Sequence, residues 1–133
     1  MKVVFADTFY FLALAYPRDQ HHKRTVQLAD NLRVRYLTSD WIITEVADAL
    51  SKGRARAQVE KLICHIRFSS VWEVVHFSEN VFERALEFHS LHHDKEWTLT
   101  DCTSFVIMGE RGITEALTGD RHFEQAGFIA LLK

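Results

Sequence analysis

Four acidic side chains stand where apolar stretches of this chain end or are interrupted. They are Asp7 in VVFADTF, Glu45 in WIITEVADAL, Asp101 in TLTDCTSF and Asp120 in LTGDRHF. Such positions lie at the edge of a hydrophobic core, where carboxylates rarely occur without a partner. Gathered together they would repel one another and raise their own pKa values unless a cation lay among them. Carboxylate oxygens suit Mg²⁺ or Mn²⁺, and such an ion can activate water against a phosphodiester.

The apolar pattern predicts a scaffold in which short strands alternate with helices. The predicted strands are residues 2–6, 34–38, 71–76, 116–118 and 128–132. The predicted helices cover 8–15, 21–33, 40–51, 54–68 and 100–110, with a further helix capped by Ser78 whose core positions are Val81, Phe82, Ala85, Leu86 and Phe88. This alternation is typical of an α/β fold with a mostly parallel sheet covered on both faces.

In an open parallel sheet, ligands bind beyond the carboxyl ends of the strands. Asp7 ends the first predicted strand and Asp120 lies just past the strand at 116–118, so both should reach the same edge. Each also has a purely structural interpretation, because Asp7 is placed to cap a helix and Asp120 follows Gly119 in a turn.

The other two acids have structural alternatives as well. Thr98 and Asp101 have the spacing of a capping box, but the helix that follows is apolar on nearly every side, so its first turn should be close to buried. Glu45 lies at the margin of the stripe formed by Ile42, Val46, Ala49 and Leu50. A lone glutamate there could simply extend outward to solvent.

Length and composition predict one folded domain covering residues 1–133. A chain of 133 residues, 47% apolar and 26% charged, can bury a core without disulfides or a structural metal. The net charge of −2 excludes a strongly basic nucleic-acid binder, so any RNA contact must be local. The candidate patch is Lys52, Arg54 and Arg56 in SKGRARAQ, with a solvated helix end as the alternative.

The two cysteines and the N-terminus predict a cytoplasmic protein. Cys64 and Cys102 lie in helix-like contexts without CxxC spacing, and we expect both to be buried thiols in a reducing compartment. The N-terminus lacks the pattern of a signal peptide, and no apolar run is long enough to span a membrane.

Several segments resemble PIN-domain ribonucleases, particularly the VapC-type toxins of prokaryotic toxin–antitoxin pairs. They are ADTFYFLAL, ITEVADAL, DKEWTLTDCTSFVIM and LTGDRHFEQAGF. The resemblance covers nearly the whole chain in order, although residues 54–90 carry little of it. It implies a three-layer α/β/α sandwich that cleaves RNA and is silenced by a small antitoxin protein. It also implies a homodimer, for which Phe9, Phe11 and Trp41 are candidate contacts.

Position by position, the resemblance implies that Asp7, Asp101 and Asp120 ligate Mg²⁺ or Mn²⁺ and that Glu45 completes the catalytic site. Thr8 and Thr118 resemble hydroxyl residues that line such sites. Gly119 stands where many relatives carry a bulkier residue, so we expect a looser turn at Asp120. For His122 we expect a structural role that ties down the loop, with contact to the substrate as the alternative.

The leading hypothesis is therefore a metal-dependent endoribonuclease, the toxin of a toxin–antitoxin pair. The alternative is a catalytically silent PIN-like module that binds RNA or protein, which the intact set of acids disfavours. A haloacid-dehalogenase-like phosphohydrolase would need a second aspartate where this chain has Phe9. A surface zinc site in the polar segment with His89, His92, His93 and Asp94 is a weaker alternative for metal binding.

Overall fold

The computed structural model describes residues 1–133 and has a central five-stranded sheet in the order β3-β2-β1-β4-β5. The strands are β1 (Val3–Ala6), β2 (Arg35–Ser39), β3 (Trp72–Val75), β4 (Glu115–Leu117) and β5 (Ile129–Ala130). All neighbouring strands pair in parallel. Their carboxyl ends therefore meet at one edge of the sheet, as the sequence predicts.

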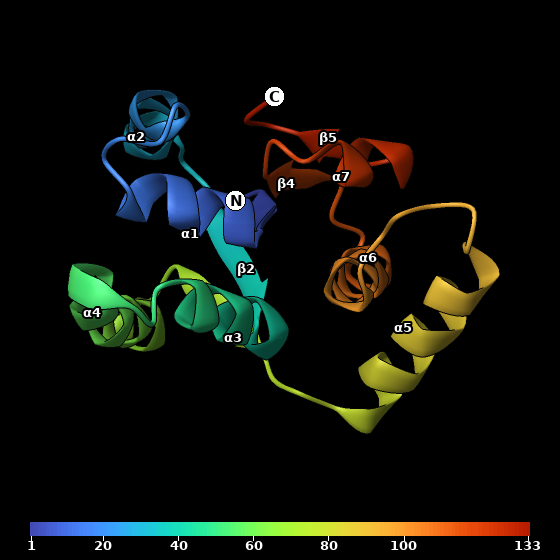
Figure 1. The fold of residues 1–133 in the computed structure, drawn as a ribbon. Coiled ribbons are helices and arrows are strands. Elements are labelled where there is room, and N and C mark those ends of the chain that lie inside the picture. Colours follow the sequence, from blue (N-terminus) through green and yellow to red (C-terminus); the bar gives the residue numbers. More distant parts are fainter.

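Helices cover both faces of this sheet. They are α1 (Thr8–Ala15), α2 (His22–Asn31), α3 (Asp40–Ala49), α4 (Arg56–Phe68), α5 (Glu79–Leu91), α6 (Leu99–Arg111) and α7 (Arg121–Gln125). The chain runs from β1 through β2 to β3, then returns to β4 on the other side of β1. With right-handed crossovers, this reversal places α1 to α4 on one face and α5 with α6 on the other (Figure 1). The three-layer α/β/α prediction is confirmed.

The reversal of strand order also defines where the sheet can bind a ligand. β1 is flanked by β2 on one side and by β4 on the other, and the connections leaving them go to opposite faces. The crevice between the carboxyl ends of β1 and β4 is the topological switch point of the sheet. Asp7 follows β1, and Thr118 and Asp120 follow β4.

The burial of residues confirms the prediction that α6 is apolar on nearly every side, but it confirms only part of the core predicted for α5. Residues 102–108 of α6 are all buried, because this helix lies between the sheet and α5. In α5, Val81 and Ala85 are buried and Phe88 is partly buried. Phe82 and Leu86 are 39% and 36% exposed, so their predicted core positions are wrong. The physical reason is that α5 packs mainly against α6 and needs only a narrow apolar stripe.

Other expectations need correction. Cys64 is exposed on the outer face of α4, and only Cys102 is a buried thiol. Phe11 is buried in the core and is unavailable as a dimer contact, whereas Phe9 and Trp41 are partly buried. Ala49 is exposed rather than part of the apolar stripe of α3.

Several element boundaries differ from the prediction, and one helix was missed. The helix predicted after Ser78, α5, continues to Leu91 and therefore includes His89. The last strand, β5, has two residues rather than five, and α7 was not predicted because five residues are too few to show helical periodicity. None of the helices combines the length and apolar character that crossing a membrane requires.

Candidate active site

All four acids line one cavity of about 280 Å³ at the carboxyl edge of the sheet. The remaining lining residues are Thr8, Phe9, Thr98 and His122. The sequence placed Asp7 and Asp120 at this edge from strand order alone, while α3 and α6 bring in Glu45 and Asp101. The convergence that the hypothesis required is therefore present in the fold.

Asp7 is the most deeply placed of the four. It has the backbone conformation of a helix N-cap before α1, but its side chain makes no capping hydrogen bond. Its carboxyl is held instead by Thr118, whose Oγ1 donates to Oδ2 at 2.8 Å. Burial is the main cause that raises the pKa of Asp7 to about 7; the hydrogen bond from Thr118 opposes this change, and the nearby carboxylates of Asp101 and Glu45 add to it. A cation in the cavity would relieve this cost.

Thr118 joins two of the acids. Besides donating to Asp7, its Oγ1 accepts a hydrogen bond from the backbone N–H of Asp120 at 3.1 Å. Asp120 in turn caps α7, since its Oδ1 accepts from the backbone N–H of His122 at 2.8 Å. The predicted turn role of Asp120 and its place in the cavity therefore coexist.

Asp101 also serves two purposes. It forms the predicted capping box, in which its N–H donates to Thr98 Oγ1 at 3.0 Å and its Oδ2 accepts from the Thr98 N–H at 3.1 Å. Its side chain is nevertheless only 13% exposed and faces the cavity. The capping interpretation is confirmed, and the same side chain also lines the acidic cavity.

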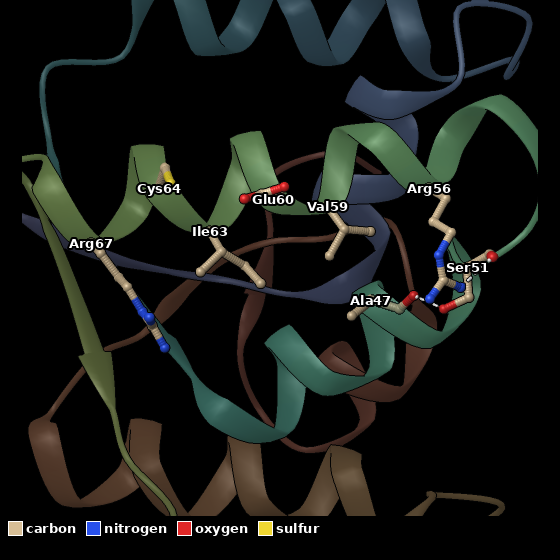
Figure 2. Close-up of a pocket in the computed structure, with 8 residues that line it drawn as sticks. All are labelled: Ala47, Ser51, Arg56, Val59, Glu60, Ile63, Cys64 and Arg67. Carbon is tan, nitrogen blue, oxygen red and sulfur yellow. Dashed lines mark hydrogen bonds between the residues drawn. The ribbon is translucent and has the colours of Figure 1, made fainter.

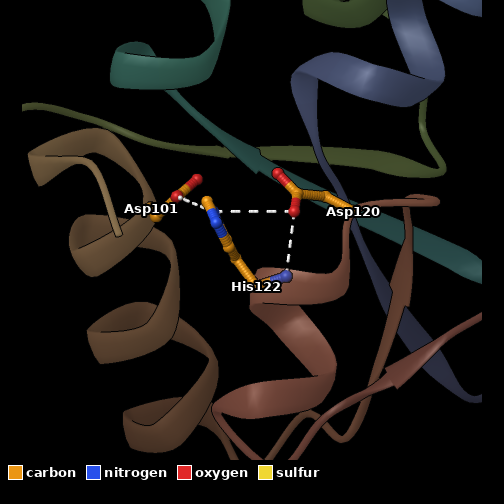
Figure 3. A group of neighbouring side chains, drawn as sticks. All are labelled: Asp101, Asp120 and His122. Carbon is orange, nitrogen blue, oxygen red and sulfur yellow. Dashed lines mark hydrogen bonds and ion pairs between the residues drawn. The ribbon is translucent and has the colours of Figure 1, made fainter. Parts of the chain in front are cut away.

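His122 links the start of α7 to the start of α6, which agrees with the structural role expected for it. Its Nδ1 lies 3.0 Å from Asp101 Oδ2 and 3.6 Å from Asp120 Oδ1, so the imidazole lies between the two carboxylates (Figure 3). Asp101, Asp120 and His122 can each offer a ligand atom within 4.8 Å of the others. The sequence indicates this position, because His122 comes two residues after Asp120 at the start of a helix, and its side chain therefore faces the same cavity.

Glu45 lies at the exposed rim of the cavity, in the middle of α3. Its Oε1 accepts a hydrogen bond from Thr8 Oγ1, which ties it to the residue next to Asp7. Thr8 and Thr118 thus each donate a hydrogen bond to one of the acids, and Thr8 also lines the cavity. The donor set of carboxylate oxygens, with one imidazole beside them, is suited to a hard divalent cation such as Mg²⁺ or Mn²⁺.

The basic candidates lie elsewhere. Lys52, Arg54 and Arg56 are exposed around the short 3-10 helix Gly53–Ala55 and the start of α4, and none of them lines the acidic cavity. Arg56 Nη1 donates to the carbonyl oxygen of Ser51 at 2.9 Å (Figure 2). The hollow there, about 500 Å³, is larger than the acidic cavity, but Glu60 is its one carboxylate. It has no paired acids for hydrolytic chemistry.

The zinc alternative is not supported by the geometry. The Nδ1 of His92 interacts with the carbonyl oxygen of Phe88 at 2.8 Å, and its ring packs against Trp97. His89, His92 and His93 form no group of potential metal ligands. The one such group in the chain is at the acidic cavity.

Comparison with known proteins places this fold and site in a family. The PIN domain family model matches residues 4–129, and the chain belongs to the PIN domain family. The 23S rRNA-specific endonuclease VapC20 of Mycobacterium tuberculosis is 29% identical over 127 residues, which cover 96% of each chain.

Solved structures agree with this assignment. The crystal structure of Mycobacterium tuberculosis VapC20, described as a sarcin-ricin loop cleaving toxin, matches with a TM-score of 0.87 and 27% identity over 96% of this chain and 98% of that one. FitAcB from Neisseria gonorrhoeae matches with a TM-score of 0.67 and 16% identity over 96% and 94% of the two chains. DNA-bound VapBC from Salmonella typhimurium matches with a TM-score of 0.66 and 15% identity over 98% and 97%. The last two likenesses concern the fold alone.

Proposed function

We propose that this chain is a metal-dependent endoribonuclease of the VapC type, the toxin of a toxin–antitoxin pair. The observation that carries the proposal is the convergence of Asp7, Glu45, Asp101 and Asp120 on one cavity at the switch point of the sheet. The likeness to VapC20 supports ribosomal RNA of the large subunit as the first substrate to examine.

Each acid has a role that follows from its contacts. Asp7, Asp101 and Asp120 would hold Mg²⁺ or Mn²⁺, and a bound ion of this kind polarises a phosphodiester and lowers the pKa of water. Thr118 fixes the carboxyl of Asp7 and the backbone of Asp120, while His122 fixes the carboxylate of Asp101. Thr8 holds Oε1 of Glu45, which leaves Oε2 to accept the proton of the attacking water.

We further infer a cognate antitoxin protein and a homodimer as partners of this chain. The support is membership of the family and an exposed aromatic surface, where Phe77 is 58% exposed beside Trp41. Light scattering coupled to size-exclusion chromatography measures the dimer directly. A monomer at every concentration would contradict that part of the proposal.

The deciding experiment is cleavage of 23S rRNA and a mixed structured RNA pool by the purified protein. Reactions contain Mg²⁺, Mn²⁺ or EDTA, and Asp101→Asn purified in parallel controls for contaminating nucleases. We expect metal-dependent cutting that EDTA and the substitution both abolish. Equal cutting by Asp101→Asn would contradict the assigned site. No cutting, with RNA still bound, would favour the silent binding module.

A further inference from the structure

The acidic cavity has a single apolar wall, and that wall is an aromatic ring. Phe9 lies two residues after Asp7 in the first turn of α1, and every other residue lining the cavity is polar or charged. Phe9 is only partly buried, although Phe11 in the same helix is fully in the core. The ring is therefore open to whatever enters the cavity.

The Phe9 ring is packed directly against the backbone that carries two site residues. A Cβ atom built on Gly119 would lie 2.5 Å from Cζ of Phe9 and 3.0 Å from Cε1 and Cε2. The backbone of Gly119 has no positive φ, so glycine is required here for space and not for conformation. The sequence-based expectation of a looser turn at Asp120 is wrong, because the ring fills the space that a side chain would occupy.

A second contact fixes the ring from another side. The imidazole of His21 lies against Phe9 with centroids 4.9 Å apart and planes tilted by 55°. The backbone N–H of His21 donates to Asp19 Oδ1 at 2.7 Å, which anchors the backbone from which this imidazole extends. With two fixed neighbours, the ring loses little conformational freedom when a ligand packs on it.

We propose that Phe9 is a nucleobase-stacking residue, which receives the base next to the scissile phosphate and contributes to sequence preference. The inference rests on the proposed ribonuclease function. A cavity lined by four carboxylates attracts a phosphodiester only through its cations, whereas an aromatic face binds a splayed base without charge. Gly119 takes part by leaving room for the ring beside Asp120.

Phe9→Leu tests the stacking, because leucine keeps apolar bulk but has no aromatic face. We expect the KM for RNA to rise about tenfold, the base preference beside the cut to weaken, and the affinity for Mn²⁺ alone, measured by calorimetry, to stay unchanged. The matched control is Phe11→Leu, the same change in the same helix but inside the core. It should lower the melting temperature without changing KM or base preference.

Gly119→Ala gives an independent test, since its new methyl group must displace the ring. We expect a KM increase similar to that of Phe9→Leu, and no further increase when Gly119→Ala is added to Phe9→Ala, where no ring remains to be moved. If the two substitutions raised KM independently, so that their fold-changes multiplied, the coupling between Gly119 and the Phe9 ring would be contradicted.

The outcomes separate this inference from the proposed function. If the wild type cleaves RNA and Phe9→Leu changes KM and preference less than twofold, the stacking role is wrong and the nuclease stands. If the wild type does not cleave, RNA binding tests the stacking role instead. A labelled RNA is titrated with Asp101→Asn and with the double variant Asp101→Asn, Phe9→Leu, and the two affinities are compared. Equal affinities, or no binding by either protein, would overturn the stacking role.

Discussion

Nδ1 of His122 lies 3.0 Å from Oδ2 of Asp101, the same oxygen that accepts the backbone N–H of Thr98. Both donors converge on one oxygen of the carboxylate, and no protein group donates to Oδ1. The helix cap and the histidine thus occupy Oδ2 and leave Oδ1 for a ligand. This arrangement explains how one aspartate can start a helix and serve the cavity.

Replacement of His122 should separate its role as a donor from a role as a metal ligand. We expect His122→Ala to weaken Mn²⁺ binding and to slow RNA cleavage by about tenfold, because orientation of a ligand by a neighbouring donor is typically worth that much. His122→Asn can keep an N–H near the position of Nδ1 and should restore most of both. Calorimetry and single-turnover cleavage measure the two effects. If asparagine were as poor as alanine, the imidazole would act as more than a donor.

Loss of the Thr118 hydroxyl should impair two acids at once. Thr118→Val keeps the buried shape but removes the hydrogen bonds to Asp7 and to the N–H of Asp120. We expect metal affinity to fall at least about tenfold and the protein to lose about 1–3 kcal/mol of stability. Thr118→Ser, which retains the hydroxyl, is the control. Unchanged metal affinity in the valine variant would refute the link between these residues.

The buried carboxyl of Asp7 should make stability of the metal-free protein depend on pH. Its folded pKa is about 7, above the ordinary aspartate value of 3.8, so the folded state binds the extra proton between these values. Stability should therefore fall as pH rises from about 4 to about 7 and level off above, with a total effect on the order of 4 kcal/mol. Urea unfolding in EDTA measures it. Asp7→Asn should flatten this dependence and be the more stable protein at pH 8, and the opposite order would contradict the prediction.

A divalent ion should stabilise the folded protein and offset the cost of burying the ionised carboxylate of Asp7. Because the ion binds the folded state, its presence at about one hundred times Kd should add about 2.7 kcal/mol to the free energy of unfolding. We expect Mn²⁺ to raise the melting temperature at pH 8 and EDTA to reverse the change. The rise should be lost in Asp7→Asn and in Asp101→Asn, and an equal rise in both variants would place the ion elsewhere.

The basic patch can be tested by its salt dependence. Lys52, Arg54 and Arg56 form no ion pair with a carboxylate, so no acidic side chain neutralises their charges. Their combined replacement by alanine should weaken RNA binding and reduce the slope of log K against log salt by up to about 3.

A matched control changes the net charge equally at other places. Lys2, Arg111 and Lys133 are each paired with a glutamate, and their combined replacement should leave the slope nearly unchanged. Equal effects of the two triple variants would show that only net charge matters and would remove the patch from the RNA-binding surface.

The sequence by itself determined all the strands and α-helices except α7, and it determined which acids the site contains. Apolar runs that end in Asp7 and precede Asp120 were sufficient to place both at one sheet edge, because parallel strands share the direction of their carboxyl ends. The capping box of Asp101 was also readable, since it depends on residues three apart. Local pattern and strand order carry this information.

The tertiary structure decided what depends on contacts between distant segments. Phe82 and Cys64 are exposed because α5 and α4 pack against few other elements. The periodicity of apolar residues within one helix does not indicate how many elements will pack against it. The place of His122 between two carboxylates requires α7 to pack beside the start of α6. The contact between Phe9 and Gly119, 110 positions apart, appears only when α1 meets the loop after β4, because close packing is a property of the folded chain.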